Sequence, residues 1–126
     1  MCMEDQKMEG IRNAQITGTS ITMGDHACLT FWVYLEGYGW GCGFGGYCIG
    51  HGYVDANSFK AESGKGLEAM MRIMDVVGVD KWEDLKGKYV RCQFEGLGGG
   101  VAAIGNIIKE KKWFNIREFF KDGEQE

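Results

Sequence analysis

Residues 66–114 read GLEAMMRIMDVVGVDKWEDLKGKYVRCQFEGLGGGVAAIGNIIKEKKWF, and their local signals follow one another in a clear order. Apolar residues at helical spacing that stop at a glycine, Gly78, predict a helix over residues 66–77. The offsets 0, 3, 4, 7 and 10 define one apolar face, which would carry Leu67, Met70, Met71, Met74 and Val77.

Capping signals and glycines organise the segment after that helix. Asp80 and Glu83 have the spacing of a capping box, which predicts a short helix over residues 81–85 that ends at Gly87. Residues 88–95 are rich in strand formers and predict a strand. A glycine turn over residues 96–100 then leads to a neighbouring strand.

That return strand is predicted over residues 101–109. Asn115 and Glu118 form a second capping box, which predicts a C-terminal helix over residues 116–121. The first residues, 1–9, are charged and aperiodic, and we expect a frayed start there.

The strongest strand signal lies earlier, in ACLTFWVYL at residues 27–35. Both of its faces are largely apolar, with Trp32 and Tyr34 on the second one. Such a strand is expected to be central in its sheet or to pack against a partner subunit. Further strands are predicted at residues 11–23, interrupted near Gly18, and at residues 39–49, followed by a polar loop at 54–63.

These elements predict an α+β fold: a small antiparallel β-sheet with one amphipathic helix, a short capped helix and a C-terminal helix. The 126 residues are the size of one domain, so we expect a single domain over residues 1–126. The net charge of −4 argues against duplex nucleic acid, which requires a basic face. No segment has the length of a membrane span, and we expect a cytoplasmic protein.

Glycine and cysteine usage argue against two familiar kinds of site. The segment GCGFGG at residues 41–46 matches a dinucleotide fingerprint, but no helix signal follows it, so we predict a glycine-rich strand. Cys42, Cys48 and His51, with His26 and Cys28, are conceivable zinc ligands. Their spacing contains no Cys-x2-Cys pair, and the five cysteines are an odd number, so free thiols and no metal are expected.

The sequence shows no catalytic pattern, and we expect a protein that is not an enzyme. One short segment does combine aromatic, cationic and amide side chains. These residue types suit a nucleotide, because an aromatic ring offers a flat surface for the base, cations bind the phosphates, and an amide can bind a base edge or the ribose. The candidate ligand-binding residues are Trp82, Lys86, Lys88, Arg91, Asn106 and Lys109. Alternatively, Trp82 is a core anchor and the lysines are merely solvated.

Three strings add a resemblance: FGGYCIGHGY at residues 44–53, AMMRIMDVVGVDKWEDLKGKYVR at 69–91 and IGNIIKEKKWFNIREFF at 104–120. In these strings the chain resembles the first-described phage sponges that act against the bacterial Thoeris defence. The resemblance implies dimers or trimers of dimers in the host cytoplasm that need no cofactor. It also implies binding, without degradation, of glycocyclic ADP-ribose isomers between protomers and of cyclic oligonucleotides at further sites.

In that family an aromatic side chain stacks on adenine and an arginine of the neighbouring protomer closes the pocket. The resemblance gives the stacking role to Trp82 and the pocket-closing role to Lys109. Lys109 departs from the family's arginine, because an ammonium group cannot stack as a planar guanidinium does. An alternative from another class is a phage inhibitor that binds a host defence protein through exposed aromatic side chains, as anti-CRISPR proteins do. A third alternative is an enzyme that cleaves the same nucleotide signal.

Overall fold

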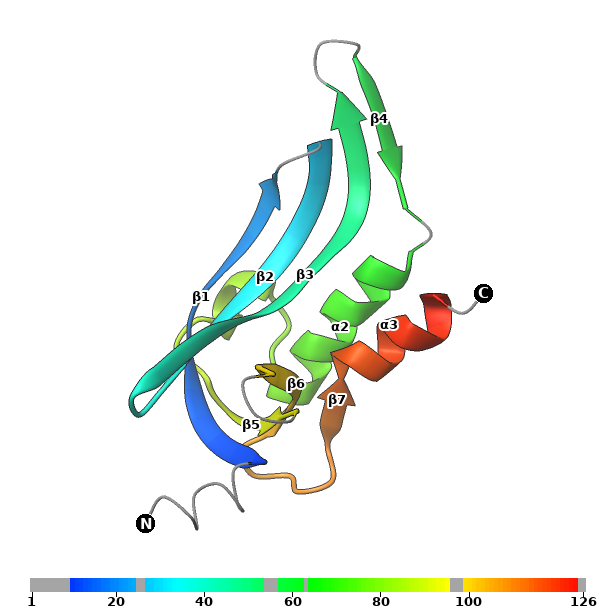
Figure 1. The fold of residues 1–126 in the computed structure, drawn as a ribbon. Helices are drawn as coiled ribbons and strands as arrows, with labels where there is room; N and C mark the ends of the chain where they lie inside the picture. The colour runs from blue at the N-terminus through cyan, green and yellow to red at the C-terminus, as the bar shows by residue number, and fades with distance from the viewer. Residues whose placement is uncertain (1–9, 25–26, 54–56, 63, 96–98, 125–126) are drawn as a thin grey trace.

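The computed structural model describes residues 10–24, 27–53, 57–62, 64–95 and 99–124. In this part of the chain a seven-stranded antiparallel sheet, ordered β4-β3-β2-β1-β5-β6-β7, curves around helix α2, as Figure 1 shows. The predicted α+β class is therefore confirmed. The frayed start predicted at residues 1–9 lies outside the described residues, as do residues 96–98 of the predicted glycine turn. None of the described helices is long and apolar enough to cross a membrane.

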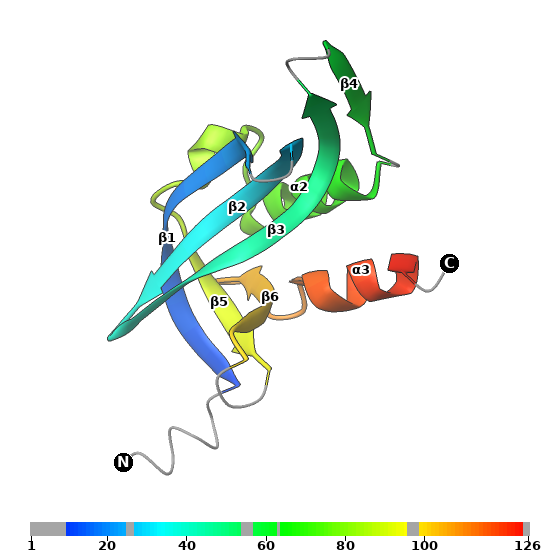
Figure 2. The ribbon, with the colours of Figure 1, turned by 45° about the horizontal axis from the view of Figure 1, so that its top comes forward.

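Strand β1, Ile11–Met23, joins the two halves of the sheet. Its first part, residues 11–15, pairs with β5, and its second part, residues 15–23, pairs with β2. The change of partner along one long, bent strand is visible in Figure 2. A register shift lies between Ile16 and Gly18, where the sequence predicted an interruption. A bulge of this kind bends a strand and increases its twist, which suits a sheet that wraps a helix.

Strands β2, Cys28–Gly37, and β3, Trp40–Tyr53, form the longest hairpin. Phe31, Val33 and Leu35 of β2 are buried in the core. On the other face Trp32 lies over two glycines of β3, Gly43 and Gly46, where a β-carbon would come within 2.8 Å and 2.6 Å of the indole ring. The glycine-rich segment is thus a strand, as predicted, and its glycines make room for an aromatic side chain.

Two short strands were not predicted. Strand β4, Ser58–Ala61, pairs with the end of β3, where the sequence predicted a polar loop. Strand β7, Trp113–Asn115, pairs with β6. All four residues of β4 are exposed, so no apolar alternation marked this edge strand in the sequence.

Helix α2, Lys65–Val77, begins and ends close to its predicted limits. Gly78 has a φ of 94° and donates its N–H to Met74 O, which confirms the glycine stop. The predicted apolar face was wrong in phase, because Leu67 and Met71 are 55% and 62% exposed. The buried positions of α2 are instead Gly66, Ala69, Ile73 and Val76.

The physical reason for the phase error is the close approach of α2 to β3. A β-carbon on Gly66 would lie 2.1 Å from Ile49 Cγ2, so only glycine permits this contact. Small residues let a helix lie close to a sheet. The predicted face was chosen from large apolar side chains, so it left out small residues such as Gly66 and Ala69. Met70, Met74 and Val77 flank the buried stripe and pack against the core at its margin.

The predicted short helix is a 3-10 turn, η3, Trp82–Leu85. Its N-cap residue is Lys81, and no side chain caps it, so the capping box of Asp80 and Glu83 was wrong. Leu85 anchors the turn in the core. The following residues form β5, Tyr89–Phe94, and β6, Val101–Asn106, which ends three residues before its predicted limit because Asn106 turns the chain.

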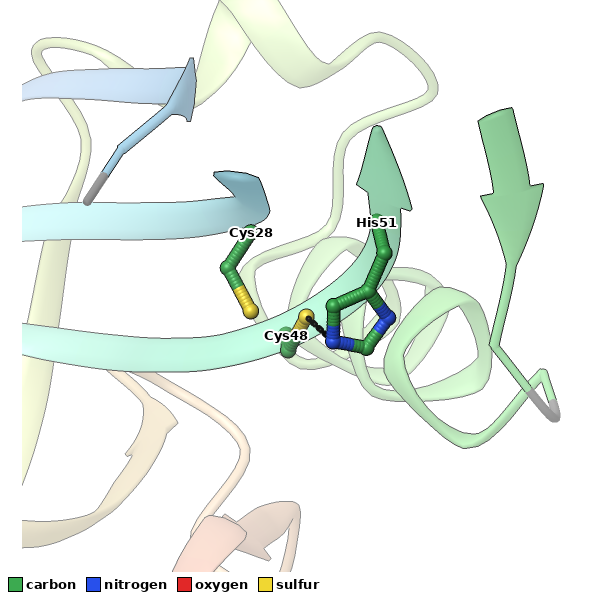
Figure 3. Close-up of side chains that lie close together, drawn as sticks. All are labelled: Cys28, Cys48 and His51. Atoms are coloured by element: carbon green, nitrogen blue, oxygen red, sulfur yellow. Dashed lines mark hydrogen bonds between the residues drawn. The ribbon is translucent and has the colours of Figure 1, made fainter. Parts of the chain in front are cut away.

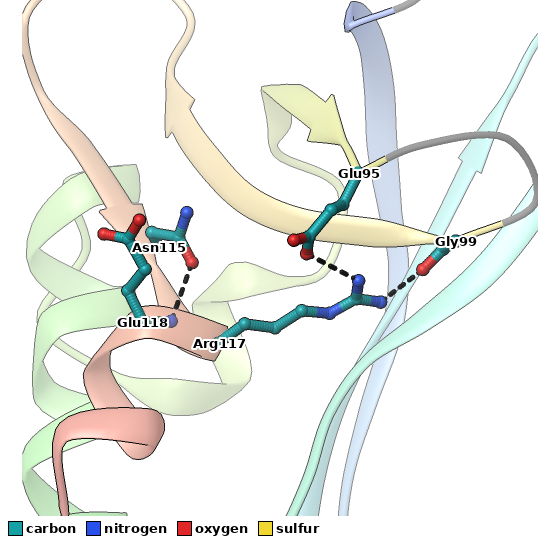
Figure 4. Close-up of polar contacts among 5 residues, drawn as sticks. All are labelled: Glu95, Gly99, Asn115, Arg117 and Glu118. Carbon is teal, nitrogen blue, oxygen red and sulfur yellow. Dashed lines mark hydrogen bonds and ion pairs between the residues drawn. The ribbon is translucent and has the colours of Figure 1, made fainter.

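Helix α3, Ile116–Glu124, starts at the second predicted capping box. Glu118 donates its backbone N–H to Asn115 Oδ1 at 3.0 Å, as Figure 4 shows. Arg117 ties the helix to the β5–β6 connection through an ion pair with Glu95 and a hydrogen bond to Gly99 O. The ring of Phe120 stacks on Tyr47 of β3 at 3.8 Å, which holds α3 beside the sheet.

Candidate functional site

A hollow of about 540 Å³ lies where α2 ends and η3 begins, and it contains two of the predicted ligand residues. We call it the 78–88 hollow. Its walls carry three lysines, Lys81, Lys86 and Lys88, and three acids, Asp80, Glu83 and Asp84, besides Gly78 and Val79. Its size lies within the usual range for small-molecule sites, about 300–1,000 Å³.

The charges of the 78–88 hollow balance, three ammonium groups against three carboxylates. Such a wall offers hydrogen-bond donors to phosphate oxygens and acceptors to sugar hydroxyls. Its one apolar side chain is Val79, and none of its lining residues is aromatic.

Trp82 lies on η3 beside the hollow, but its ring belongs to the core margin. The indole meets the fully buried Phe31 edge to face at 6.2 Å. Among the described residues none accepts a hydrogen bond from Trp82 Nε1, although that atom is buried. This environment corresponds to the core-anchor alternative for Trp82, with one unpaired donor left over.

Arg91 was predicted as a phosphate ligand, and the structure gives its guanidinium several partners within the chain. Nε donates to Asn106 O at 2.8 Å, while one Nη donates to the carbonyls of Lys109 and Glu110. The guanidinium also lies 4.6 Å from the ring centre of Trp113. In this arrangement Arg91 holds the β6–β7 connection in place.

Asn106 is similarly engaged. Its amide nitrogen donates to Val76 O at 2.8 Å, near the end of α2. Its Oδ1 accepts the backbone N–H groups of Ile108 and Lys109. The side chain of Lys109 itself is exposed. The structure therefore brings Arg91 of β5 beside Asn106 and Lys109 at the β6–β7 connection. It places Lys86 and Lys88 in the hollow at the end of α2.

A separate cluster gathers three residues that sequence spacing had set aside as metal ligands. The ligand atoms of Cys28, Cys48 and His51 all lie within 4.8 Å of one another. Figure 3 shows the three side chains converging from β2 and β3. Cys42 lies away from them, paired with Leu35 toward the other end of β3. His26 lies outside the described residues. Spacing along the sequence failed to indicate this cluster because its members come from two strands.

The thiols of the cluster influence one another. A hydrogen bond with Cys48, with smaller contributions from burial and nearby negative charge, raises the pKa of the Cys28 thiol above its usual value. Cys48 Sγ also donates to Gly50 O at 3.0 Å. His51 Nδ1 lies 2.7 Å from a carboxylate oxygen of Glu62, just beyond β4.

Comparisons with protein-family models, with curated proteins and with solved structures found no match.

Proposed function

We propose that this protein binds a cyclic nucleotide immune signal of the glycocyclic ADP-ribose type and sequesters it without chemical change, so that bacterial anti-phage defence is blocked. Cyclic oligonucleotides are proposed as further ligands. The observation that carries the proposal is the 78–88 hollow, which combines ligand-site volume with ammonium groups and carboxylates. It lies within the second of the three strings that resemble phage Thoeris sponges.

The chemistry of the hollow suits both polar parts of such a ligand. A cyclic ADP-ribose isomer carries a pyrophosphate, which Lys86 and Lys88 would meet with charge-assisted hydrogen bonds. It also carries ribose hydroxyls, which can donate to the carboxylates of the hollow. Binding of this kind requires no nucleophile or general base.

The base requires an apolar surface that the hollow of one protomer lacks. We infer that a second copy of the chain supplies it, in keeping with the inter-protomer pockets that the resemblance implies. The outer face of β2 supports self-association, because Tyr34 is 41% exposed on a central strand. Lys109, exposed on the loop held by Arg91 and Asn106, is the candidate cation from the partner.

A second candidate is capture of a host protein. Several aromatic side chains are exposed, among them Tyr34, Tyr38 and Phe59. An aromatic surface of this kind also suits a protein partner. This alternative predicts that the protein takes up no nucleotide, and that replacing Lys86 and Lys88 does not change its inhibition of the host defence.

Calorimetry with a cyclic ADP-ribose isomer tests the proposed site. The double variant Lys86→Ala/Lys88→Ala should lose about 1.5–3 kcal/mol for each charge-assisted hydrogen bond removed, and its binding should depend less on salt. Lys121→Ala, an exposed lysine of α3, is the matched control and should bind as the wild type does. Equal affinity in the double variant and the wild type would contradict the site.

A further inference from the structure

The pairing of β2 with β3 explains why Cys28, Cys48 and His51 converge. Cys28 pairs with His51, and Thr30, on the same face as Cys28, pairs with Cys48. In a regular strand residues 48 and 51 would lie on opposite faces. A register shift leaves Ile49 as an extra residue on β3, and this bulge turns both side chains to the face of Cys28.

The separations within the cluster approach those of a tetrahedral metal site. Zinc–sulfur and zinc–nitrogen bonds of about 2.3 Å and 2.0–2.1 Å place sulfur and nitrogen about 3.6 Å apart, and two sulfurs about 3.8 Å apart. Cys48 Sγ lies 3.7 Å from His51 Nε2, and no pair of ligand atoms in the cluster is separated by more than 4.8 Å.

The imidazole of His51 is already oriented as in many zinc sites. Its Nδ1 lies 2.7 Å from the Glu62 carboxylate, which can only accept, so we assign the proton to Nδ1. Nε2 is then unprotonated, and Figure 3 shows this nitrogen on the side of the ring that points toward Cys48 and Cys28. A carboxylate behind a histidine is the usual second layer of a zinc site, where it fixes the tautomer and the ring orientation.

Glu62 is itself held in place by the bulge. Its backbone N–H donates to Ile49 O at 3.1 Å. The bulged residue therefore positions both the ligands and the group that orients one of them. The cluster is partly exposed, with His51 and Glu62 side chains 42% and 40% accessible, so an ion can enter from solvent.

We propose that Cys28, Cys48 and His51 form a Zn²⁺ site that joins the start of β2 to the end of β3. Two thiolates and one imidazole are a ligand set that zinc prefers, and they leave one coordination position for water or another small ligand. Zinc takes the place of the thiol hydrogen bond from Cys48 to Gly50 O. The proposal is independent of nucleotide binding, because none of these residues lines the 78–88 hollow.

Metal analysis and cobalt substitution test the site on the full chain, purified and kept under a non-chelating reductant. We expect about one Zn²⁺ per chain, as for a single three-ligand site. Replacement by Co²⁺ should give the thiolate charge-transfer absorption and the intense visible bands of tetrahedral cobalt. Substoichiometric zinc after reconstitution, or the weak bands of octahedral cobalt, would overturn the proposal.

Substitutions assign the ligands. Cys48→Ser and His51→Gln should each weaken zinc binding by more than about 100-fold, and Glu62→Gln by about 10- to 100-fold. Cys42→Ser is the matched control, a cysteine of the same strand outside the cluster, and should keep full affinity. Circular dichroism of the metal-free proteins checks the fold. Loss of zinc from Cys42→Ser alone, or full binding by Cys48→Ser, would show that the site is wrong.

Discussion

At the scale of single residues, the structure separates side chains that hold the fold from those left free for a ligand. Arg91 and Asn106 are engaged by carbonyls and amides of the chain, whereas Lys86, Lys88 and Lys109 are exposed. The sequence predicted residue types suited to a nucleotide. It did not show which of them were already bonded within the chain, because those bonds depend on strand pairing distant in sequence.

Trp82 allows a test that separates folding from binding. Trp82→Ala should lower the free energy of unfolding by about 3 kcal/mol, because a largely packed ring is removed. Trp82→Phe keeps a ring against Phe31 and removes the unpaired Nε1–H, so its stability should stay near that of the wild type. Urea denaturation measures both. A loss in Trp82→Phe as large as in Trp82→Ala would contradict the core-anchor role.

Binding by the same variants then tests the stacking role that the resemblance gives to this residue. If Trp82 stacks on a base, Trp82→Ala should lose about 1–3 kcal/mol of affinity under conditions where it remains folded. Unchanged affinity in folded Trp82→Ala would assign the aromatic surface to another residue.

Cys92 should be the least reactive of the described thiols. Burial, with a smaller contribution from Cys42, raises its pKa from 9.0 to about 12. A raised pKa leaves less thiolate at any given pH, so at pH 8 alkylation of Cys92 should be slower than that of Cys42. Peptide mass spectrometry after timed alkylation measures both rates. Equal rates in the native protein would contradict the burial of Cys92.

At the scale of elements, the sequence predicted what local chemistry determines. The stop of α2 at Gly78 and the start of α3 after Asn115 follow from backbone and cap geometry within a few residues. Strands β4 and β7 and the phase of the α2 face were missed. Their physical causes, an exposed edge strand and the close approach of Gly66 to Ile49, depend on tertiary contacts.

The cap of α3 gives a direct test at this scale. Asn115→Ala removes the acceptor for the Glu118 N–H and should lower stability by about 0.5–2 kcal/mol. Asn115→Asp keeps an acceptor and should restore most of the loss. Denaturation curves measured by circular dichroism give both values. An equal loss in Asn115→Ala and Asn115→Asp would contradict the cap.

At the scale of the whole molecule, the candidate sites also divide into one predicted from local sequence and one that depends on tertiary contacts. Lys86 and Lys88 were predicted because cationic, aromatic and amide residues occur together in one short segment, and both line the 78–88 hollow. The convergence of Cys28, Cys48 and His51 could not be predicted, because a bulge in β3 has no signature in the spacing of its residues. The outer aromatic face of β2 was predicted from alternation alone.

That outer face leads to a prediction about assembly. Light scattering at micromolar concentration should show a dimer or larger oligomer, since a central strand with Trp32 and Tyr34 on its open face gains from a partner. Tyr34→Lys should shift the protein toward the monomer without unfolding it. Tyr38→Lys, in the fully exposed β2–β3 turn, is the control. A wild-type mass of 14.1 kDa would exclude self-association.

Capture and release of the nucleotide distinguishes sequestration from catalysis and from the absence of binding. The purified protein is incubated with a cyclic ADP-ribose isomer, freed of unbound ligand, denatured by heat and analysed by mass spectrometry. Sequestration predicts that the nucleotide is retained by the folded protein and released intact, at the ratio of ligand to chain that calorimetry gives. Release of a cleaved product would make the protein an enzyme, and failure to retain any nucleotide would contradict the sponge function.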